Sequence, residues 1–150
     1  MSFTLLWVED DPDDILLGGR ALIKGGFEKP QIVRDGEDAI AYLSGKAPFD
    51  DRAQFPMPSL VLLDLKLPRK SGIEVLKWIR GMEGLKRIPV VILTSSRERH
   101  DIDRAYDTGA NAYLVKPVEH RTFTEVVRGL HLFWATLNTR PEATFQSSSK

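Results

Sequence analysis

The sequence predicts an α/β fold in which a mostly parallel sheet has helices packed on both of its faces. Two observations predict it. Short apolar runs, bounded by charged residues, Gly or Pro, recur along the 150-residue chain, and each is followed by a segment with the apolar spacing of a helix. Such runs are typical of strands buried on both faces. Strand and helix alternate five times, which favours right-handed crossover connections within one domain.

The first half of the chain contains the first two strand–helix pairs. The run LLWV (5–8) predicts a strand, and a helix is expected over 13–24, with Pro12 in its first turn and Gly25-Gly26 at its end. A weaker strand is expected near QIVR (31–34), followed by a helix over 36–44.

The second half contains three stronger strands, each followed by a helix. The strands are LVLL (60–63), VVIL (90–93), which Pro89 precedes, and AYLV (112–115). The corresponding helices are expected over 73–82, 99–108 and 120–138. The last helix has one apolar stripe at helical spacing, made up of Phe123, Val126, Val127, Leu130, Phe133, Trp134 and Leu137.

Two segments lack a periodic pattern. Residues 45–59 contain three prolines and are longer than the usual connection between such elements, so we expect an exposed irregular loop. Residues 139–150 end in a polar run, and we expect a flexible tail there. The predicted organisation is one domain over 1–138 with a C-terminal tail over 139–150.

Composition excludes several classes of site. Lys plus Arg and Asp plus Glu both number 21, so the net charge gives no general reason to expect a nucleic acid or an anionic membrane as a partner. Cysteine is absent, which excludes disulfides, thiolate zinc sites and cysteine nucleophiles. The N-terminus lacks the basic start of a signal peptide, and no apolar run is long enough to cross a bilayer. We expect a soluble cytoplasmic domain.

Acids, a hydroxyl and a lysine follow four of the predicted strands. Glu9, Asp10 and Asp11 come after the first strand, and Asp64 after the third. Thr94 follows the fourth strand and Lys116 the fifth. Because ligands bind at the carboxyl ends of strands in open α/β sheets, we expect these side chains to converge on one edge of the sheet.

Carboxylates held this close repel one another unless a cation lies between them. Mg²⁺ fits, since it takes oxygen ligands from one or two carboxylates, waters and phosphate oxygens. Glu9, Asp10 and one oxygen of Asp64 are the candidate ligands, with a backbone carbonyl near Lys66. The other oxygen of Asp64 is then placed to attack a phosphoryl group, with Lys116 and Thr94 as candidate partners of the phosphoryl oxygens. We expect that a cis Lys116–Pro117 bond would aim the lysine most easily.

Each residue alone also has an ordinary structural interpretation. Asp64 could be a turn or cap residue, the acids after the first strand could be a solvated helix N-terminus, and Lys116 could be a surface lysine. The combination of all four segments is what favours a site.

Four motifs together make the chain resemble the receiver domain of two-component response regulators over residues 3–138. They are WVEDD (7–11), LLDLKLPRKSG (62–72), ILTSS (92–96) and TGANAYLVKP (108–117). The resemblance implies a doubly wound, flavodoxin-like five-stranded parallel sheet of order 2-1-3-4-5. It also implies that the protein is a phosphoacceptor rather than an enzyme acting on other substrates.

The resemblance further implies roles for individual residues. A sensor histidine kinase or phosphotransfer protein would phosphorylate Asp64. Mg²⁺ would be bound by Glu9, Asp10, Asp64 and the carbonyl of Lys66, and Lys116 would contact the phosphoryl group. Thr94 and Tyr113 would be the switch pair, with phosphorylation drawing Thr94 inward and letting Tyr113 rotate in.

Finer features are similar to the small regulators paired with phytochrome-type kinases. These features are the 45–59 loop, the run from Asp64 to Pro68 and the helix end FWATLN. Since only residues 139–150 follow the receiver region, we expect a single-domain regulator. The output surface is expected to be the face formed by the fourth helix, fifth strand and fifth helix. Homodimerisation through Phe133, Trp134, Leu137 and Leu132 is one expected readout, and binding of a different protein is another.

Two other interpretations remain open at this point. One is a Mg²⁺-dependent phosphatase with an aspartyl-phosphate intermediate, although Lys66 stands where that chemistry usually has a second acid. The other is a degenerate receiver that only binds proteins, against which the complete set of Glu9, Asp10, Asp64, Thr94 and Lys116 argues.

Overall fold

The computed structural model describes residues 3–141 and contains one parallel sheet. Its strands are β1 (Leu5–Val8), β2 (Gln31–Val33), β3 (Leu60–Leu63), β4 (Val90–Thr94) and β5 (Ala112–Val115). Their order is β2-β1-β3-β4-β5, and every neighbouring pair is parallel. The predicted five-stranded, doubly wound sheet of order 2-1-3-4-5 is therefore confirmed.

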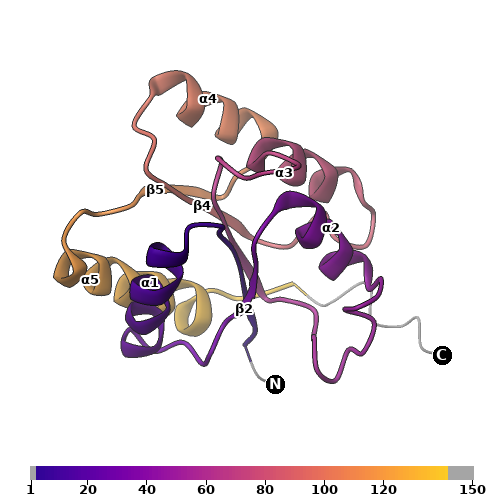
Figure 1. Ribbon diagram of the computed structural model, residues 1–150, viewed down its shortest axis with the longest axis horizontal. Helices are drawn as coiled ribbons and strands as arrows, with labels where there is room; N and C mark the ends of the chain where they lie inside the picture. Colours follow the sequence, from indigo (N-terminus) through magenta and orange to yellow (C-terminus); the bar gives the residue numbers. More distant parts are fainter. Residues whose placement is uncertain (1–2, 142–150) are drawn as a thin grey trace.

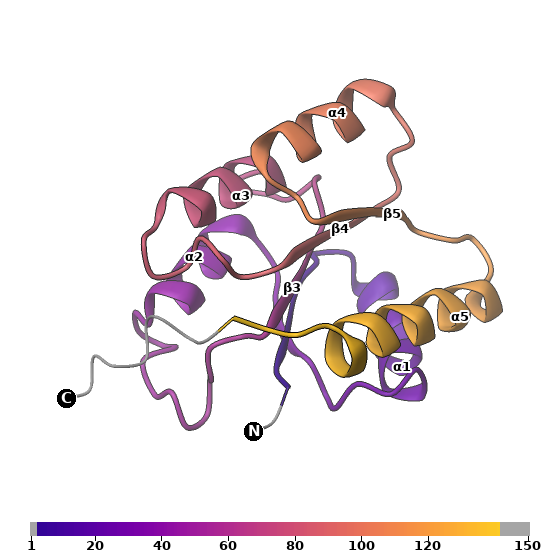
Figure 2. The same ribbon diagram turned by 180° about the vertical axis from the view of Figure 1, so that it is seen from behind.

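Helices cover both faces of this sheet (Figures 1 and 2). Helices α1 and α5 pack together on one face, and α2, α3 and α4 lie on the other. Their bounds are α1 (Pro12–Lys24), α2 (Gly36–Ser44), α3 (Gly72–Gly81), α4 (Arg99–Thr108) and α5 (His120–His131).

Local caps explain where the first three helices begin. Asp11 and Asp35 accept backbone N–H groups at the starts of α1 and α2. Ser71 and Glu74 form a reciprocal capping box at the start of α3. Each cap satisfies N–H groups that have no partner within the helix.

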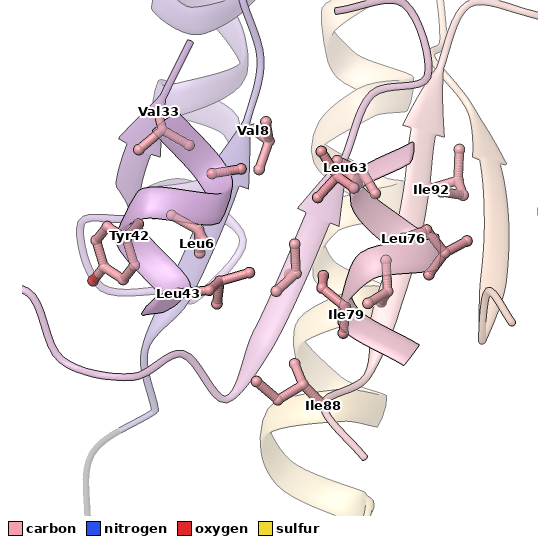
Figure 3. Close-up of a cluster of buried hydrophobic side chains, with 14 of the residues drawn as sticks. Leu6, Val8, Val33, Tyr42, Leu43, Leu63, Leu76, Ile79, Ile88 and Ile92 are labelled. Atoms are coloured by element: carbon pink, nitrogen blue, oxygen red, sulfur yellow. The ribbon is translucent and has the colours of Figure 1, made fainter. Parts of the chain in front are cut away.

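The central strands β1, β3 and β4 are buried on both faces and divide the core into two clusters. Leu6, Val8, Leu63 and Ile92 point toward α2 and α3 and pack there with Tyr42, Leu76 and Ile79 (Figure 3). Alternate residues, including Leu5, Trp7, Leu62 and Leu93, pack in the second cluster with Leu22 of α1 and Val127 of α5. Alternation along each strand thus holds both helical layers on the sheet.

The C-terminal helix differs from the prediction of one regular helix over 120–138. The α-helix ends at His131, and a π-helix η1 (Leu132–Leu137) continues it. The N–H of Asn138 donates to the carbonyl of Phe133 at 2.7 Å, which is the wider hydrogen bond of a π-turn. This change of register shifts η1 off the apolar stripe, so Phe133 is about half exposed while Trp134 still packs against the second core cluster.

The 45–59 segment is irregular as predicted, but it is only partly exposed. Phe49, Phe55 and Met57 pack against the first core cluster, and Tyr42 of α2 donates a hydrogen bond to the carbonyl of Pro56. Arg52 stacks over the Tyr42 ring and bonds the Leu43 and Phe55 carbonyls. Apolar residues between the prolines explain why this long loop folds back onto the domain.

Two further predictions concern the C-terminal tail and membrane-spanning segments. Most of the predicted tail, 142–150, lies outside the described residues. Over residues 3–141, none of the helices combines the length and the apolar character that crossing a bilayer requires.

Candidate functional site

The carboxyl ends of four strands place the predicted site residues along one edge of the sheet. Glu9 directly follows β1, Asp64 follows β3, Thr94 ends β4, and Lys116 follows β5. Backbone bonds continue the ladder into the site: Asp64 N–H donates to the Val8 carbonyl, and Lys116 N–H donates to the Thr94 carbonyl at 2.7 Å. The strands themselves therefore hold these residues in register.

Lys116 is the centre of the site. Its ammonium nitrogen lies near three carboxylates, at 2.7 Å from Glu9 Oε1, 2.8 Å from Asp14 Oδ2 and 2.9 Å from Asp64 Oδ2. Burial alone would lower the pKa of Lys116, but the hydrogen bonds to Asp14, Glu9 and Asp64 outweigh it and raise the pKa. Lys116 is thus a fixed positive charge at this edge of the sheet.

Glu9 is fully buried, and its ionised form is disfavoured. Burial raises the pKa of Glu9 to about 7, with repulsion from Asp64 adding to the rise and Lys116 partly opposing it. A second cation nearby would stabilise the ionised form of such a buried carboxylate.

Glu9, Asp10 and Asp64 each offer a carboxylate oxygen within 4.8 Å of the others. Oxygen donors grouped this closely fit a hard divalent cation such as Mg²⁺. The raised pKa of Glu9 fits the same site, because a bound cation would offset the burial and the lesser repulsion from Asp64 that disfavour its ionised form.

Both oxygens of Asp64 have partners in the structure. Oδ1 accepts the backbone N–H of Lys66 at 3.1 Å, and Oδ2 accepts from Lys116. Each oxygen of an ionised carboxylate can accept more than one hydrogen bond, so attack by one oxygen of Asp64 stays a prediction. The bond from Lys66 N–H brings its peptide against Asp64, and its carbonyl remains a predicted metal ligand.

Thr94 and Tyr113, the predicted switch pair, lie on the adjacent strands β4 and β5. The Thr94 hydroxyl is buried, and within the described residues it has no hydrogen-bond partner. The Tyr113 hydroxyl donates to the Ser96 carbonyl at 3.0 Å, and its ring is partly buried against the first core cluster. Tyr113 therefore contacts the loop after β4 in this structure, and its rotation on phosphorylation stays a prediction.

The geometry of Lys116 differs from the prediction in one respect. The Lys116–Pro117 bond is trans, since the cis bond in residues 3–141 is Ala47–Pro48. The lysine reaches its three carboxylates without the cis bond because its four-carbon side chain is flexible.

Asp14 is a site residue that our reasoning from the sequence missed. It lies in the first turn of α1 and accepts a hydrogen bond from Lys116. A signal was present, because Asp14 shares a helical stripe with Gly18, Ala21 and Leu22, which α1 buries against the sheet. Counting that stripe back toward the helix start leads to Asp14.

Comparison with known proteins agrees with this geometry. The family model described as "Response regulator receiver domain" matches residues 5–128. The response regulator Rcp1 of Synechocystis sp. is 37% identical over 140 residues, which are 93% of each chain.

Two solved structures are also similar. The phosphorylated cyanobacterial phytochrome response regulator RcpA has a TM-score of 0.84 at 36% identity, covering 95% of this chain and 100% of that one. The Mn²⁺-bound form of response regulator Rcp1 has a TM-score of 0.82 at 36% identity, covering 93% of this chain and 99% of that one. The chain belongs to the response regulator receiver domain family of two-component signalling, whose members are phosphoacceptors rather than classical enzymes.

Proposed function

We propose that this protein accepts a phosphoryl group on Asp64 from a phosphohistidine of a sensor histidine kinase or phosphotransfer protein. The observation that carries the proposal is the cluster at the sheet edge: Asp64 is 7% exposed, it lies beside Glu9 and Asp10, and Lys116 contacts it at 2.9 Å. A nearly buried carboxylate with a fixed cation and an acidic pair beside it fits the requirements of in-line phosphoryl transfer.

The transfer forms one bond and breaks one. An oxygen of Asp64 attacks the phosphorus, an O–P bond forms, and the P–N bond to the donor histidine breaks. The electron pair of that bond stays with the imidazole nitrogen, which takes up a proton from water. Lys116 stabilises the negative charge of the phosphoryl oxygens, and the buried Thr94 hydroxyl has a hydrogen to donate to one of them.

Glu9, Asp10, Asp64 and the carbonyl of Lys66 are the proposed ligands of Mg²⁺. When bound, the metal supplies positive charge between the carboxylates and the phosphoryl oxygens. Support comes from the 4.8 Å cluster and from the similarity to the Mn²⁺-bound structure of Rcp1.

Signal output is proposed to pass through Thr94 and Tyr113 to the face formed by α4, β5 and α5. A hydrogen bond from Thr94 to the phosphoryl group would pull the loop after β4 toward Asp64. Tyr113 is bonded to Ser96 in this loop, and Ser96 Oγ in turn donates to Asp101 of α4 at 2.6 Å. Movement of the loop would therefore reach α4 through contacts that already exist.

A phytochrome-type histidine kinase is the proposed donor, and a homodimer is the proposed readout. The first rests on similarity to RcpA, whose description names phytochrome signalling. The proposed homodimer rests on the exposed apolar side chains of η1, which are Leu132, Phe133 and Leu137. We also propose that the receiver spans 1–138, and that the protein is cytoplasmic, since a chain without cysteine suits a reducing compartment.

Intact-mass measurement after incubation with Mg²⁺ and a small-molecule phosphoryl donor tests this function. Wild type should gain one labile phosphoryl group, and Asp64→Asn should gain none while keeping its circular dichroism spectrum. Asp107→Asn is a matched control, because Asp107 is exposed on α4, away from the site. Labelling of Asp64→Asn at the wild-type rate would disprove the site assignment.

A further inference from the structure

The ammonium group of Lys116 is enclosed by three carboxylates. Its nitrogen lies 2.7–2.9 Å from oxygens of Glu9, Asp14 and Asp64, and it donates hydrogen bonds to Asp14 and Asp64 and forms an ion pair with Glu9. For Lys116 to bind a phosphoryl oxygen on Asp64, it has to give up or weaken one of these contacts.

The three partners differ in how easily water can replace Lys116. The side chains of Glu9 and Asp64 are 0% and 7% exposed, whereas that of Asp14 is 42% exposed. The Lys116 contact with Asp64 passes to the phosphoryl group carried by that residue. Releasing Glu9 would leave a buried carboxylate unpaired in the interior, which costs far more than releasing Asp14, which water already reaches. Asp14 is therefore the partner that Lys116 leaves at the lowest cost.

The position of Asp14 is set by α1 and not by the acidic cluster at the strand ends. Asp11 accepts the backbone N–H groups of Asp13 and Asp14 and fixes the first turn of the helix. An open pocket beside the pair is lined by both Asp14 and Lys116 and by the fully exposed Val118. The released carboxylate would thus remain on a rigid helix with access to water.

We infer that Asp14 is a positioning residue that holds Lys116 in the unphosphorylated protein and competes with the phosphoryl group for it. The inference rests on the proposed function and deepens it, because it assigns Asp14 a part in setting how strongly the site accepts phosphorylation. Binding of a phosphoryl oxygen by Lys116 replaces the Asp14 contact, and water then solvates Asp14.

Removing the charge of Asp14 should consequently favour the phosphorylated form. In Asp14→Asn the near-isosteric amide still fits but attracts Lys116 less. Partly exposed ion pairs contribute modestly, so the affinity for a phosphoryl mimic should rise by about threefold to tenfold.

Titration with beryllium fluoride at saturating Mg²⁺ tests this, with the Mg²⁺ affinity measured separately for each variant. Asp13→Asn is the matched control: it removes the same charge one residue earlier, from an exposed side chain that forms no ion pair with Lys116 in residues 3–141. Asp14→Glu keeps the charge and serves as the conservative variant.

The expected result is tighter binding by Asp14→Asn, less than about twofold change for Asp13→Asn, and near-wild-type affinity for Asp14→Glu. Unchanged or weaker binding by Asp14→Asn would overturn the inference, as would equal tightening by Asp13→Asn or by Asp14→Glu. If wild type binds no beryllium fluoride, the proposed function fails and the inference fails with it. Wild-type binding without the Asp14 effect refutes the inference alone.

Discussion

At the scale of one residue, Glu9 lowers the free energy of unfolding at neutral pH. Its pKa is raised from 4.5 to about 7, mainly by burial. Between these pH values the folded protein holds a proton that the unfolded chain has lost. The free energy of unfolding therefore falls as pH rises from about 4.5 to about 7, and the loss persists at higher pH.

Glu9→Gln should remove this pH-dependent loss. In metal-free buffer, the variant should gain stability relative to wild type as pH rises from 4.5 to above 7, by up to about 3 kcal/mol, since one pKa unit corresponds to about 1.4 kcal/mol. Urea unfolding at several pH values measures this. Glu28→Gln, at an exposed position, is the control. A stability difference that does not change with pH would contradict the prediction.

Helix α3 shows at the scale of an element how tightly the scaffold holds Asp64. A Cβ placed on Gly72, the first residue of α3, would lie 2.2 Å from the carbonyl oxygen of Asp64. The Gly72 N–H also donates to the Leu65 carbonyl at 3.0 Å. The start of α3 thus packs directly against the backbone of the proposed phosphoacceptor.

Gly72→Ala should accordingly lower the free energy of unfolding by about 2 kcal/mol or more, because the contact is with backbone that cannot rotate away. Gly81→Ala, at the other end of the same helix, has open space around it and should be neutral or stabilising by up to about 1 kcal/mol. Urea denaturation of the two variants provides the comparison. Equal effects would mean that helix propensity and not this contact determines the outcome.

At the scale of the whole molecule, η1 has a face of apolar side chains that are exposed within the described residues 3–141. Leu132, Phe133 and Leu137 are 53%, 49% and 64% exposed. Trp134, which the sequence also suggested for partner contact, packs partly against the second core cluster, with its ring 4.9 Å from that of Phe133. Leu137 is therefore a cleaner probe of association than Trp134, whose loss would also disturb the core.

If the proposed homodimer forms through this face, Leu137→Ser should raise its dissociation constant by about tenfold or more, since it removes a large apolar contact from an interface. Sedimentation velocity over a concentration series measures this. Leu16→Ser is the control, because Leu16 is similarly exposed, at 57%, but lies on α1 and not on η1. A dissociation constant that Leu137→Ser leaves unchanged would argue that the face serves a different partner or none.

The helices and strands of this fold were largely predictable from the sequence, because each depends on a short local pattern of residues. The strands 5–8, 60–63 and 112–115 have the predicted bounds, since short apolar runs flanked by breakers have few alternatives in an α/β chain. The turn to a π-helix at Leu132 was not predictable in this way. Its pattern of apolar residues is compatible with a continued α-helix, whereas the structure has a π-helix over Leu132–Leu137, after which Asn138 N–H donates to the Phe133 carbonyl.

By itself, the sequence determined which residues meet at the sheet edge, because parallel topology brings the carboxyl ends of the strands together. That reasoning led to Glu9, Asp10, Asp64, Thr94 and Lys116. Only the tertiary structure decided how they pair. Asp14 reaches Lys116 across 102 residues of chain, and Tyr113 bonds the Ser96 carbonyl, because side-chain reach and helix orientation place these groups together. Contacts of this kind depend on the packing of separate elements, which no local pattern encodes.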